Sequence, residues 1–287
     1  MTLAEALHEA ATRLLKAGID DPRLEAEVLL RHALGVDREE LFARLQEPLA
    51  LELQALYEAL VDRRLEHEPT AYIIGHKEFF GLDFACSPAA LIPRPETELL
   101  VETAIEWVRG RGSRVKDLRA VDVGSGSGVI AVSLATHLPQ ARVIATDISD
   151  KALALGRRNA LAHCVASQIE FVRGSLLEHL SGRFDLIAAN LPYIPSQTYN
   201  SLPPGIREHE PEAALRAGRR GTALIEAMLA QAVDHLAPGG VLLAEHAWNQ
   251  GRRLREAATG HFPTADIETR RDLAGLERLL VVRTARD

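Results

Sequence analysis

Cysteine is scarce in this chain. Its 287 residues include two cysteines, Cys86 and Cys164, and neither has the partner spacing of a zinc site. Two isolated cysteines fit a reducing cytoplasm, and neither thiol has the surroundings of a catalytic residue. The histidines also lack metal-ligand spacing. We therefore expect a cytoplasmic protein that holds no metal.

Long apolar runs are absent as well. No stretch of 18 or more apolar residues occurs, so we expect no segment that spans a membrane. Residues 1–22 lack a basic segment followed by an apolar one and have no cleavage-site pattern. They predict an amphipathic helix in place of a signal peptide.

The chain has no excess of positive charge, since its formal net charge is −7. Proteins that bind nucleic acid usually carry a basic face, so this balance argues against that class. Arg216, Arg219 and Arg220 form a local basic cluster, which fits a solvated loop better than a binding patch. Aromatic residues make up 5% of the chain, which leaves few partners for stacking on a flipped base.

The pattern of apolar residues changes twice along the chain. Residues 1–70 show only helical periodicity and predict a small helical bundle. Residues 71–92 contain short aromatic and β-branched runs between glycines and predict a β-hairpin. From residue 119 onward, strands alternate with helices, which predicts a mostly parallel sheet covered by helices on both faces. The strands are expected at residues 120–123, 142–146, 169–172, 184–189, 241–245 and 279–283.

A glycine-rich loop follows the first of these strands. Gly124, Gly126 and Gly128 lie at offsets 0, 2 and 4, with Ser125 and Ser127 between them. A dinucleotide-binding loop would have its glycines at offsets 0, 2 and 5. Glycine lets the backbone turn sharply and approach a ligand, and the helix that follows offers unpaired N–H groups. The spacing favours a ligand that lies flat against the loop over a pyrophosphate directed at the helix end.

Two aspartates belong to the same region. Asp147 ends the next strand, 23 residues after Gly124, where a carboxylate can accept from both hydroxyls of a ribose. S-adenosylmethionine has that ribose and no phosphate, so it is the predicted cofactor, with S-adenosylhomocysteine as product. A plain turn with an exposed aspartate is the alternative. Asp122 lies inside the strand, where an unpaired charge would cost several kcal/mol, and we expect it to accept from loop N–H groups.

The tetrapeptide Asn190-Leu191-Pro192-Tyr193 directly follows the strand expected at residues 184–189. Ligands of open α/β sheets bind beyond the carboxyl ends of strands, which places the tetrapeptide beside the cofactor. A planar amide or amino nitrogen is a poor nucleophile because its lone pair is delocalised. Two fixed acceptors on its N–H groups would stabilise the charge that develops during attack, and the Asn190 side chain and the Leu191 carbonyl can supply them. Pro192 would stiffen the turn and Tyr193 would stack on the flat group. A simple strand-ending turn is the alternative.

With these motifs in place, the chain resembles the PrmC/HemK family, which methylates the glutamine of the GGQ motif in peptide-chain release factors. The most specific match is residues 91–102, LIPRPETELLVE. The resemblance implies a class I methyltransferase fold, which is Rossmann-like with a seven-stranded, mostly parallel sheet. It also implies a helical domain at residues 1–70 that recognises the release factor, a β-hairpin linker at 71–95 and a catalytic domain at 96–287. Further matching segments are residues 72–75, 78–79, 210–211, 214–215, 238–240 and 271–275.

The resemblance implies site residues too. The expected cofactor-binding residues are Gly124, Ser125, Gly126, Ser127, Gly128, Asp147, Ser175, Leu176 and Asn190. The expected substrate-binding residues are Asn190, Leu191, Pro192, Tyr193, Arg94, Glu96 and Thr97, of which the tetrapeptide is catalytic. Several positions depart from the family pattern. Leu191 stands where proline is usual, Ser175 where aspartate is usual, and His246-Ala247 where isoleucine and glycine are usual. Ala217-Gly218 and Arg220-Gly221 stand where Gly-Gly and Asp-Gly are usual.

Three functions are compatible with these motifs. The first is methylation of release factors, which are the expected protein partners, in support of translation termination. The second is adenine N6 methylation of rRNA or DNA, because Asn-Leu-Pro-Tyr is typical of ribosomal-RNA adenine dimethylases. The third is a cofactor-binding scaffold without activity, against which the retention of Asn190, Pro192 and Tyr193 argues. We expect the first, with no membrane and no nucleic-acid partner.

Overall fold

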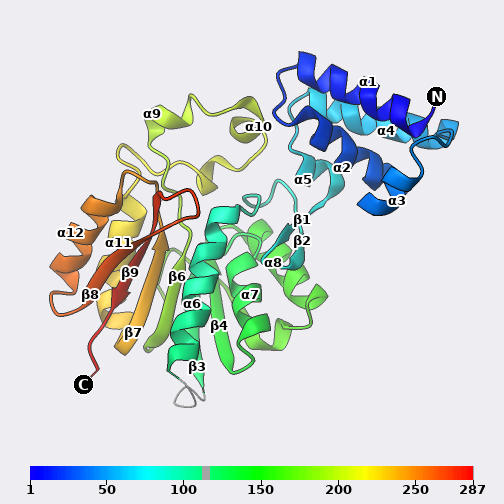
Figure 1. Cartoon of the computed structure of the whole chain (residues 1–287). Helices are drawn as coiled ribbons and strands as arrows, with labels where there is room; N and C mark the ends of the chain where they lie inside the picture. Colours follow the sequence, from blue (N-terminus) through cyan, green and yellow to red (C-terminus); the bar gives the residue numbers. More distant parts are fainter. Residues whose placement is uncertain (112–116, 287) are drawn as a thin grey trace. The chain divides into compact units, whose positions relative to one another are not determined.

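A computed structural model of the chain describes residues 1–111 and 117–286 and contains two units (Figure 1). The helical unit comprises Met1–His76 together with Pro203–His209. The α/β unit comprises Lys77–Leu202 and Glu210–Asp287. The helical unit therefore includes one short segment that lies far along the sequence from the rest of it.

The helical unit is a small bundle, as the periodicity predicted. Its helices are α1 (Leu3–Lys16), α2 (Pro22–Leu34), α3 (Arg38–Ala43), α4 (Leu51–Leu65) and α5 (Thr70–Ile74), with α10 (Pro204–Arg207) from the distant segment. Thr2 starts α1 with a reciprocal cap, in which its hydroxyl accepts from the Glu5 N–H and the Glu5 carboxylate accepts from the Thr2 N–H. Apolar side chains from α1, α2 and α4 form one buried core. His209 joins the distant segment to the unit by donating to the Glu66 carbonyl over 3.1 Å.

The predicted hairpin is shorter than expected. Its strands are β1 (His76–Phe79) and β2 (Leu82–Ala85), whereas residues 71–74 belong to α5. The strand prediction for Tyr72 and Ile73 was wrong because both side chains are buried, and Ile73 packs into the helical core. Aromatic and β-branched residues favour strands by intrinsic propensity, and burial of these side chains overrode that preference.

The α/β unit contains a seven-stranded sheet in the order β5-β4-β3-β6-β7-β9-β8. Neighbouring strands run parallel from β5 to β7, whereas β9 is antiparallel to both β7 and β8. This arrangement confirms the predicted mostly parallel sheet. The strands are β3 (Leu118–Val123), β4 (Ala141–Asp147), β5 (Ile169–Arg173), β6 (Phe184–Ala189), β7 (Leu236–Glu245), β8 (Asp266–Arg271) and β9 (Glu277–Arg283).

Strand β8 was not predicted from the sequence. Its sequence, DIETRR, has one apolar residue and four charged ones, which hides the alternation expected of a strand. It forms the edge of the sheet, where charged side chains discourage pairing with other chains. Arg283 of β9 donates across the pair to Asp266 and Glu268, so the charges also contact each other along the edge.

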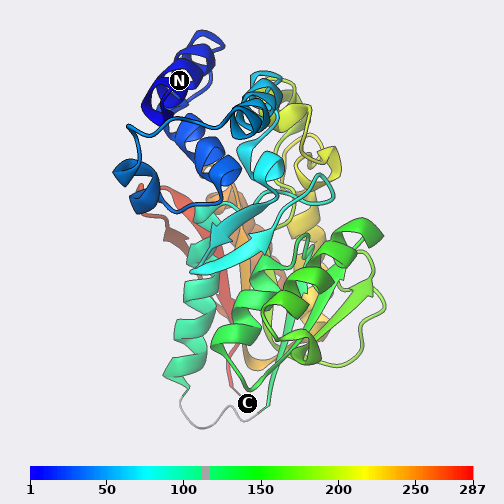
Figure 2. The ribbon, with the colours of Figure 1, turned by 90° about the vertical axis from the view of Figure 1, so that its right-hand side faces the viewer.

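Helices cover both faces of the sheet, as predicted (Figures 1 and 2). On one face, α6 (Glu98–Gly110), α7 (Val129–His137) and α8 (Asp150–Ala162) contribute to one buried cluster. On the other face, α11 (Ala223–His235) and α12 (Gly251–His261) contribute to a second cluster. Successive residues of β3 point to opposite clusters, with Ala120 in the first and Val121 in the second.

Asp122 of β3 is fully buried between these layers. Its Oδ2 accepts from the N–H of Ala131 in the first turn of α7 over 3.1 Å, so the donor is a helix N–H and not the expected loop N–H. Gly128 is the N-cap residue of α7 and has no side chain to cap the helix. Asp122 therefore replaces the missing cap from the strand. Burial raises the pKa of Asp122 to about 7.

Asp122 should make stability depend on pH in the absence of methyl donor. Its folded-state pKa lies above the ordinary value near 4, so the folded protein retains a proton that the unfolded chain loses between about pH 4 and 7. Stability from this group is therefore lost as pH rises through that window. Relative to Asp122→Asn, the wild type should lose on the order of 1–4 kcal/mol from pH 5 to pH 8 in thermal unfolding. If the free energy of unfolding depends on pH in the same way in the two proteins, the pKa of Asp122 is not raised by folding.

Candidate active site

Strands β3, β4, β6 and β7 end together at one edge of the sheet. The register pairs Val123 of β3 with Thr146 of β4 and with Ala189 of β6, and it pairs Ala189 with Ala244 of β7. The glycine loop, Asp147 and the tetrapeptide follow directly after these residues. The fold thus brings the predicted cofactor and substrate residues to the same edge.

The glycine loop is held by β4 and packs closely on the tetrapeptide. The N–H groups of Gly124 and Ser125 both donate to the Thr146 carbonyl over 2.8 Å. Gly124 has a φ of +73°, and a Cβ added to it would lie 2.8 Å from Cδ2 of Leu191. Glycine is therefore required at this position for both its backbone conformation and the close approach of Leu191.

Asp147 connects the loops that follow β3 and β4. Its Oδ2 accepts from the Gly126 N–H and its Oδ1 from the Ser149 N–H, each over 2.8 Å. Every carboxylate oxygen has two lone pairs, so each oxygen of the half-buried Asp147 can accept one further hydrogen bond. Asp147, which is predicted to bind the ribose, therefore also holds the glycine loop in place.

The chemistry of the loop fits S-adenosylmethionine. Oδ1 of Asp122 and Oγ of Ser125 are both buried at the glycine loop, and the Ser125 hydroxyl favours the ionised form of Asp122. A buried carboxylate with few donors favours a cationic ligand, and the ammonium and sulfonium groups of this cofactor are cations. On the other side of Asp147, the Leu176 carbonyl accepts from the Thr146 hydroxyl over 3.1 Å. This contact places Leu176, and with it the neighbouring Ser175, beside the end of β4. A role for the two residues in binding the cofactor stays a prediction.

The side-chain amide of Asn190 is held at one end only. Its Nδ2 donates to Oγ1 of Thr97 over 2.9 Å. Within residues 1–111 and 117–286, no hydrogen bond to Oδ1 of Asn190 is present, and the residue is partly exposed. The oxygen of Asn190 is therefore available as the acceptor that the proposed chemistry needs.

Glu245, the last residue of β7, was not predicted as a site residue. Its Oε2 accepts from the Thr97 hydroxyl over 2.7 Å, and its Oε1 accepts from the Tyr193 hydroxyl over 3.0 Å. Glu245 is 2% exposed, and burial raises its pKa. The only sign in the sequence was one carboxylate at the end of the apolar run Val241–Ala244.

The rest of the tetrapeptide is anchored by its neighbours. The Leu191 side chain is buried in the same cluster as Val123 and Ile187, so it packs into the core beneath the glycine loop. Gln250, which the sequence analysis also missed, donates through Nε2 to the Tyr193 carbonyl over 2.9 Å. Pro192 is partly exposed between these anchored residues. The backbone around the expected second acceptor is thus fixed on both sides.

Arg94 and Glu96 belong to the segment at residues 91–102. Arg94 forms an ion pair with Glu210 at 2.5 Å, and Glu210 also accepts from the Ile92 N–H over 3.1 Å. This pair fastens the family-specific segment to the loop after the tetrapeptide. Glu96 is exposed, and its charge contributes to the raised pKa of Glu245. A role for Arg94 and Glu96 in binding substrate stays a prediction.

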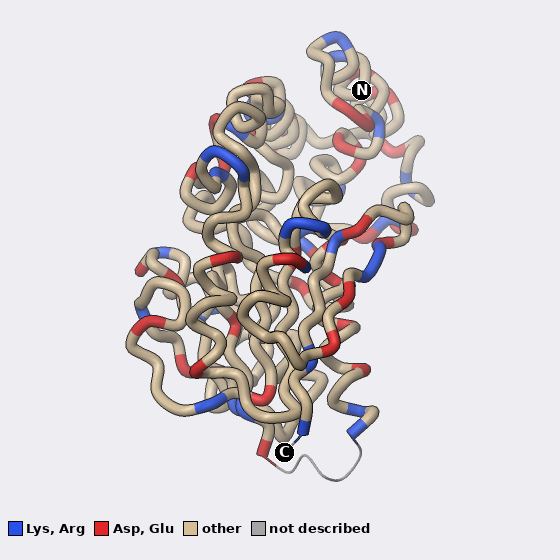
Figure 3. The backbone as a smooth tube through the Cα atoms, turned by 90° about the vertical axis from the view of Figure 1, so that its left-hand side faces the viewer, with Lys and Arg blue, Asp and Glu red and all other residues tan. Residues whose placement is uncertain are grey.

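Charge, metal-ligand and membrane features are unremarkable. On the side drawn in Figure 3, basic and acidic residues are interspersed along the chain. Across the described ranges, no group of three or more His, Cys, Asp and Glu residues could hold a metal ion. In the same residues, no helix is long and apolar enough to cross a membrane.

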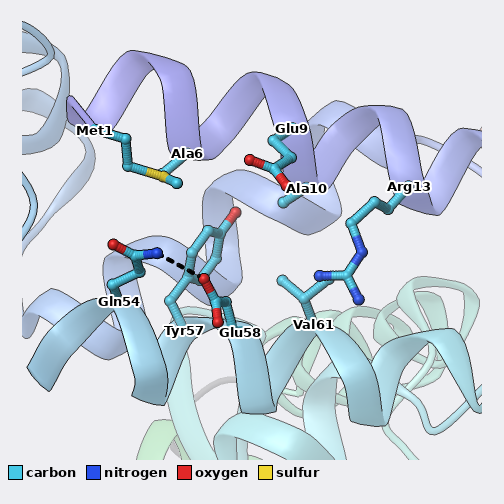
Figure 4. A pocket seen from close by; sticks show the side chains of 9 residues that line it. All are labelled: Met1, Ala6, Glu9, Ala10, Arg13, Gln54, Tyr57, Glu58 and Val61. Atoms are coloured by element: carbon cyan, nitrogen blue, oxygen red, sulfur yellow. Dashed lines mark hydrogen bonds between the residues drawn. The ribbon is translucent and has the colours of Figure 1, made fainter. Parts of the chain in front are cut away.

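A second concave site belongs to the helical unit alone. It is an open groove between α1 and α4 (Figure 4). None of the residues that follow the ends of the parallel strands contributes to it, so it is separate from the candidate active site. Its lining residues are Met1, Ala6, Glu9, Ala10, Arg13, Gln54, Tyr57, Glu58 and Val61.

Two family models match the chain. The model described as PrmC N-terminal domain matches residues 5–75, and the model described as Methyltransferase small domain matches residues 97–201. Among solved structures, a methyltransferase from Pyrococcus furiosus superposes with a TM-score of 0.53 at 18% identity, covering 73% of this chain and 92% of that one. The human METTL16 catalytic domain gives a TM-score of 0.57 at 17% identity, covering 76% and 82%. These likenesses show the methyltransferase fold.

Curated relatives match nearly the whole chain. The release factor glutamine methyltransferase of Nitratidesulfovibrio vulgaris is 42% identical over 285 residues, which cover 98% of this chain and 95% of the relative. The protein of the same name from Moorella thermoacetica is 40% identical over 279 residues, which cover 97% of each chain. The resemblance seen in the sequence motifs is thereby confirmed. This chain belongs to the release factor glutamine methyltransferase family.

Proposed function

We propose that the protein transfers a methyl group from S-adenosylmethionine to the side-chain amide nitrogen of the GGQ glutamine in peptide-chain release factors, in support of translation termination. One observation carries the proposal in particular. Thr97 holds the Nδ2 end of Asn190, so Oδ1 is the end of the amide that can accept from a substrate N–H. Family membership gives the substrate class, because the curated relatives are named for release factor glutamine methylation.

The glycine loop and the carboxylates around it would hold the cofactor. Asp147 has acceptor capacity for the ribose, and the buried carboxylate of Asp122 suits the cationic methionine part. Ser175 and Leu176, beside the end of β4, would contact the adenine ring. When bound, S-adenosylmethionine supplies an electrophilic methyl group on a sulfonium.

The tetrapeptide would prepare the substrate nitrogen. Oδ1 of Asn190 and the Leu191 carbonyl would accept from its two N–H groups and stabilise the positive charge that builds on nitrogen during attack. Tyr193 is fixed by the hydrogen bond from its hydroxyl to Glu245, so its ring can stack on the flat amide and exclude water. The methylated nitrogen is acidic enough to release its proton to water, so no strong side-chain base is required.

The helical unit would recognise the release factor. It matches the PrmC N-terminal domain and contains none of the residues assigned to chemistry. Several large apolar side chains on its helices are exposed, including Leu15 at 64% and Leu51 at 82%. Exposed leucines of this kind, and the groove between α1 and α4, are available for contact with a protein surface.

Asp147→Ala should weaken methyl-donor binding. Loss of the charge-assisted hydrogen bonds costs about 1–3 kcal/mol, or roughly a 5- to 150-fold rise in Kd. Asp147→Asn keeps one acceptor and should have a smaller effect. Titration calorimetry measures both variants, with NAD as a ligand that should not bind. An unchanged Kd in folded Asp147→Ala would remove Asp147 from the cofactor site.

Asn190→Ala should lower kcat by about 10²–10³-fold, as the loss of one preorganised acceptor does in other enzymes, while methyl-donor affinity falls less. The assay is methyl transfer to a release factor with ribosomal RNA present as competitor. Leu191→Pro retains the backbone carbonyl and should preserve turnover, although loss of packing beneath Gly124 should weaken donor binding. Full activity in Asn190→Ala would disprove the mechanism. Transfer to RNA alone would favour the adenine methyltransferase function.

Leu15→Asp combined with Leu51→Asp should raise the KM for intact release factor. Loss of the burial of one or two leucines predicts about a 10-fold or larger effect, with kcat and methyl-donor Kd unchanged. Leu161→Asp in α8 is the matched control, because Leu161 is 67% exposed in the α/β unit. Equal KM values for the double variant, the control and the wild type would exclude these two side chains from recognition.

A further inference from the structure

Three segments far apart in the sequence meet through hydrogen bonds around one carboxylate. Thr97 comes from the short helix η1 (Pro95–Thr97), Asn190 follows β6, and Glu245 ends β7. Asn190 donates to Thr97, and Thr97 in turn donates to Glu245. Thr97 and Glu245 are both 2% exposed, so water does not compete for these bonds.

The direction of each hydrogen bond follows from the chemistry of the groups. Burial raises the pKa of Glu245, and the hydrogen bonds that the Thr97 and Tyr193 hydroxyls donate to it act in the opposite direction by stabilising the ionised form. The ionised carboxylate only accepts, so with Glu245 ionised the single hydroxyl hydrogen of Thr97 points to Oε2. Oγ1 of Thr97 then has only lone pairs to offer Asn190. The NH₂ end of Asn190 can face these lone pairs, whereas its oxygen would meet another oxygen with no hydrogen between them. The contact with Thr97 therefore determines which end of the Asn190 amide is free.

We propose that Thr97, held by Glu245, is a positioning residue that locks the Asn190 amide with Oδ1 toward the substrate, so that the site selects a glutamine amide over a glutamate carboxylate. The inference rests on the proposed function and adds to it the origin of this selectivity. With Asn190 locked, the two groups that would contact the end of the substrate side chain are both acceptors. These groups are Oδ1 of Asn190 and the Leu191 carbonyl. They match the two N–H groups of a glutamine and repel a carboxylate.

Release of the lock should change selectivity as well as rate. Thr97→Val keeps the shape of the side chain and removes the hydroxyl. Asn190 can then rotate and present its NH₂ group, which donates to a carboxylate. A release factor whose GGQ glutamine is replaced by glutamate should bind the locked enzyme weakly and the unlocked enzyme more tightly. If Thr97 had only a structural role, Thr97→Val would weaken the binding of the intact and the glutamate-substituted release factors to the same extent.

The experiment measures the wild type, Thr97→Val and Thr97→Ser with intact release factor as substrate and the glutamate-substituted factor as competitive inhibitor. Thr97→Val should lower kcat about 10-fold and lower the Ki of the inhibitor about 10-fold, with methyl-donor Kd within about 2-fold of the wild type. Thr97→Ser restores the hydroxyl and should return both values toward the wild type. Thermal unfolding confirms that each variant is folded.

Glu245→Gln is the second variant, in case Thr97→Val does not fold. The amide of Gln can donate to Oγ1 of Thr97, which frees the threonine hydroxyl to donate to Oδ1 of a rotated Asn190, so the Ki should fall by a smaller factor. A reduced kcat with an unchanged Ki in the folded variants would overturn the positioning role while the proposed function stands. A wild type that methylates no release factor would overturn the proposed function, and this inference with it.

Discussion

The substrate half of the site depends on one buried carboxylate. Glu245 is removed from water at the end of β7, which would be costly without donors, and the hydroxyls of Thr97 and Tyr193 supply them. Satisfying that carboxylate brings η1 and the tetrapeptide to the same strand end. The orientation of the Asn190 amide and of the Tyr193 ring both follow from it.

The cofactor half is organised by two other carboxylates at neighbouring strand ends. Asp122 caps α7 from within β3, and Asp147 ties Gly126 to the loop after β4. Leu191 packs against Gly124 and so joins this half to the tetrapeptide. Because parallel strands end at one edge, residues from four separate loops can act on one methyl group without any of them being close in sequence.

Much of the candidate site could be predicted from the sequence. The glycine loop, Asp147 and Asn190–Tyr193 are local motifs, and their residue types indicate their chemistry. The contact between Thr97 and Glu245 could not be predicted, since it joins residues 148 positions apart. Strand β8 was missed because an edge strand tolerates the charges that hide its alternation. Residues 71–74 were misassigned because burial, and not residue type, placed them in a helix.

In the proposed mechanism, the two acceptors of the tetrapeptide present a glutamine amide nitrogen to the methyl donor. Tandem mass spectrometry of purified release factor, after incubation with enzyme and isotope-labelled S-adenosylmethionine, would locate the transferred methyl group. We expect one labelled methyl group on the side-chain nitrogen of the GGQ glutamine and none when that residue is replaced. A labelled methyl group on any other residue, or an unmodified factor beside methylated ribosomal RNA, would contradict this mechanism.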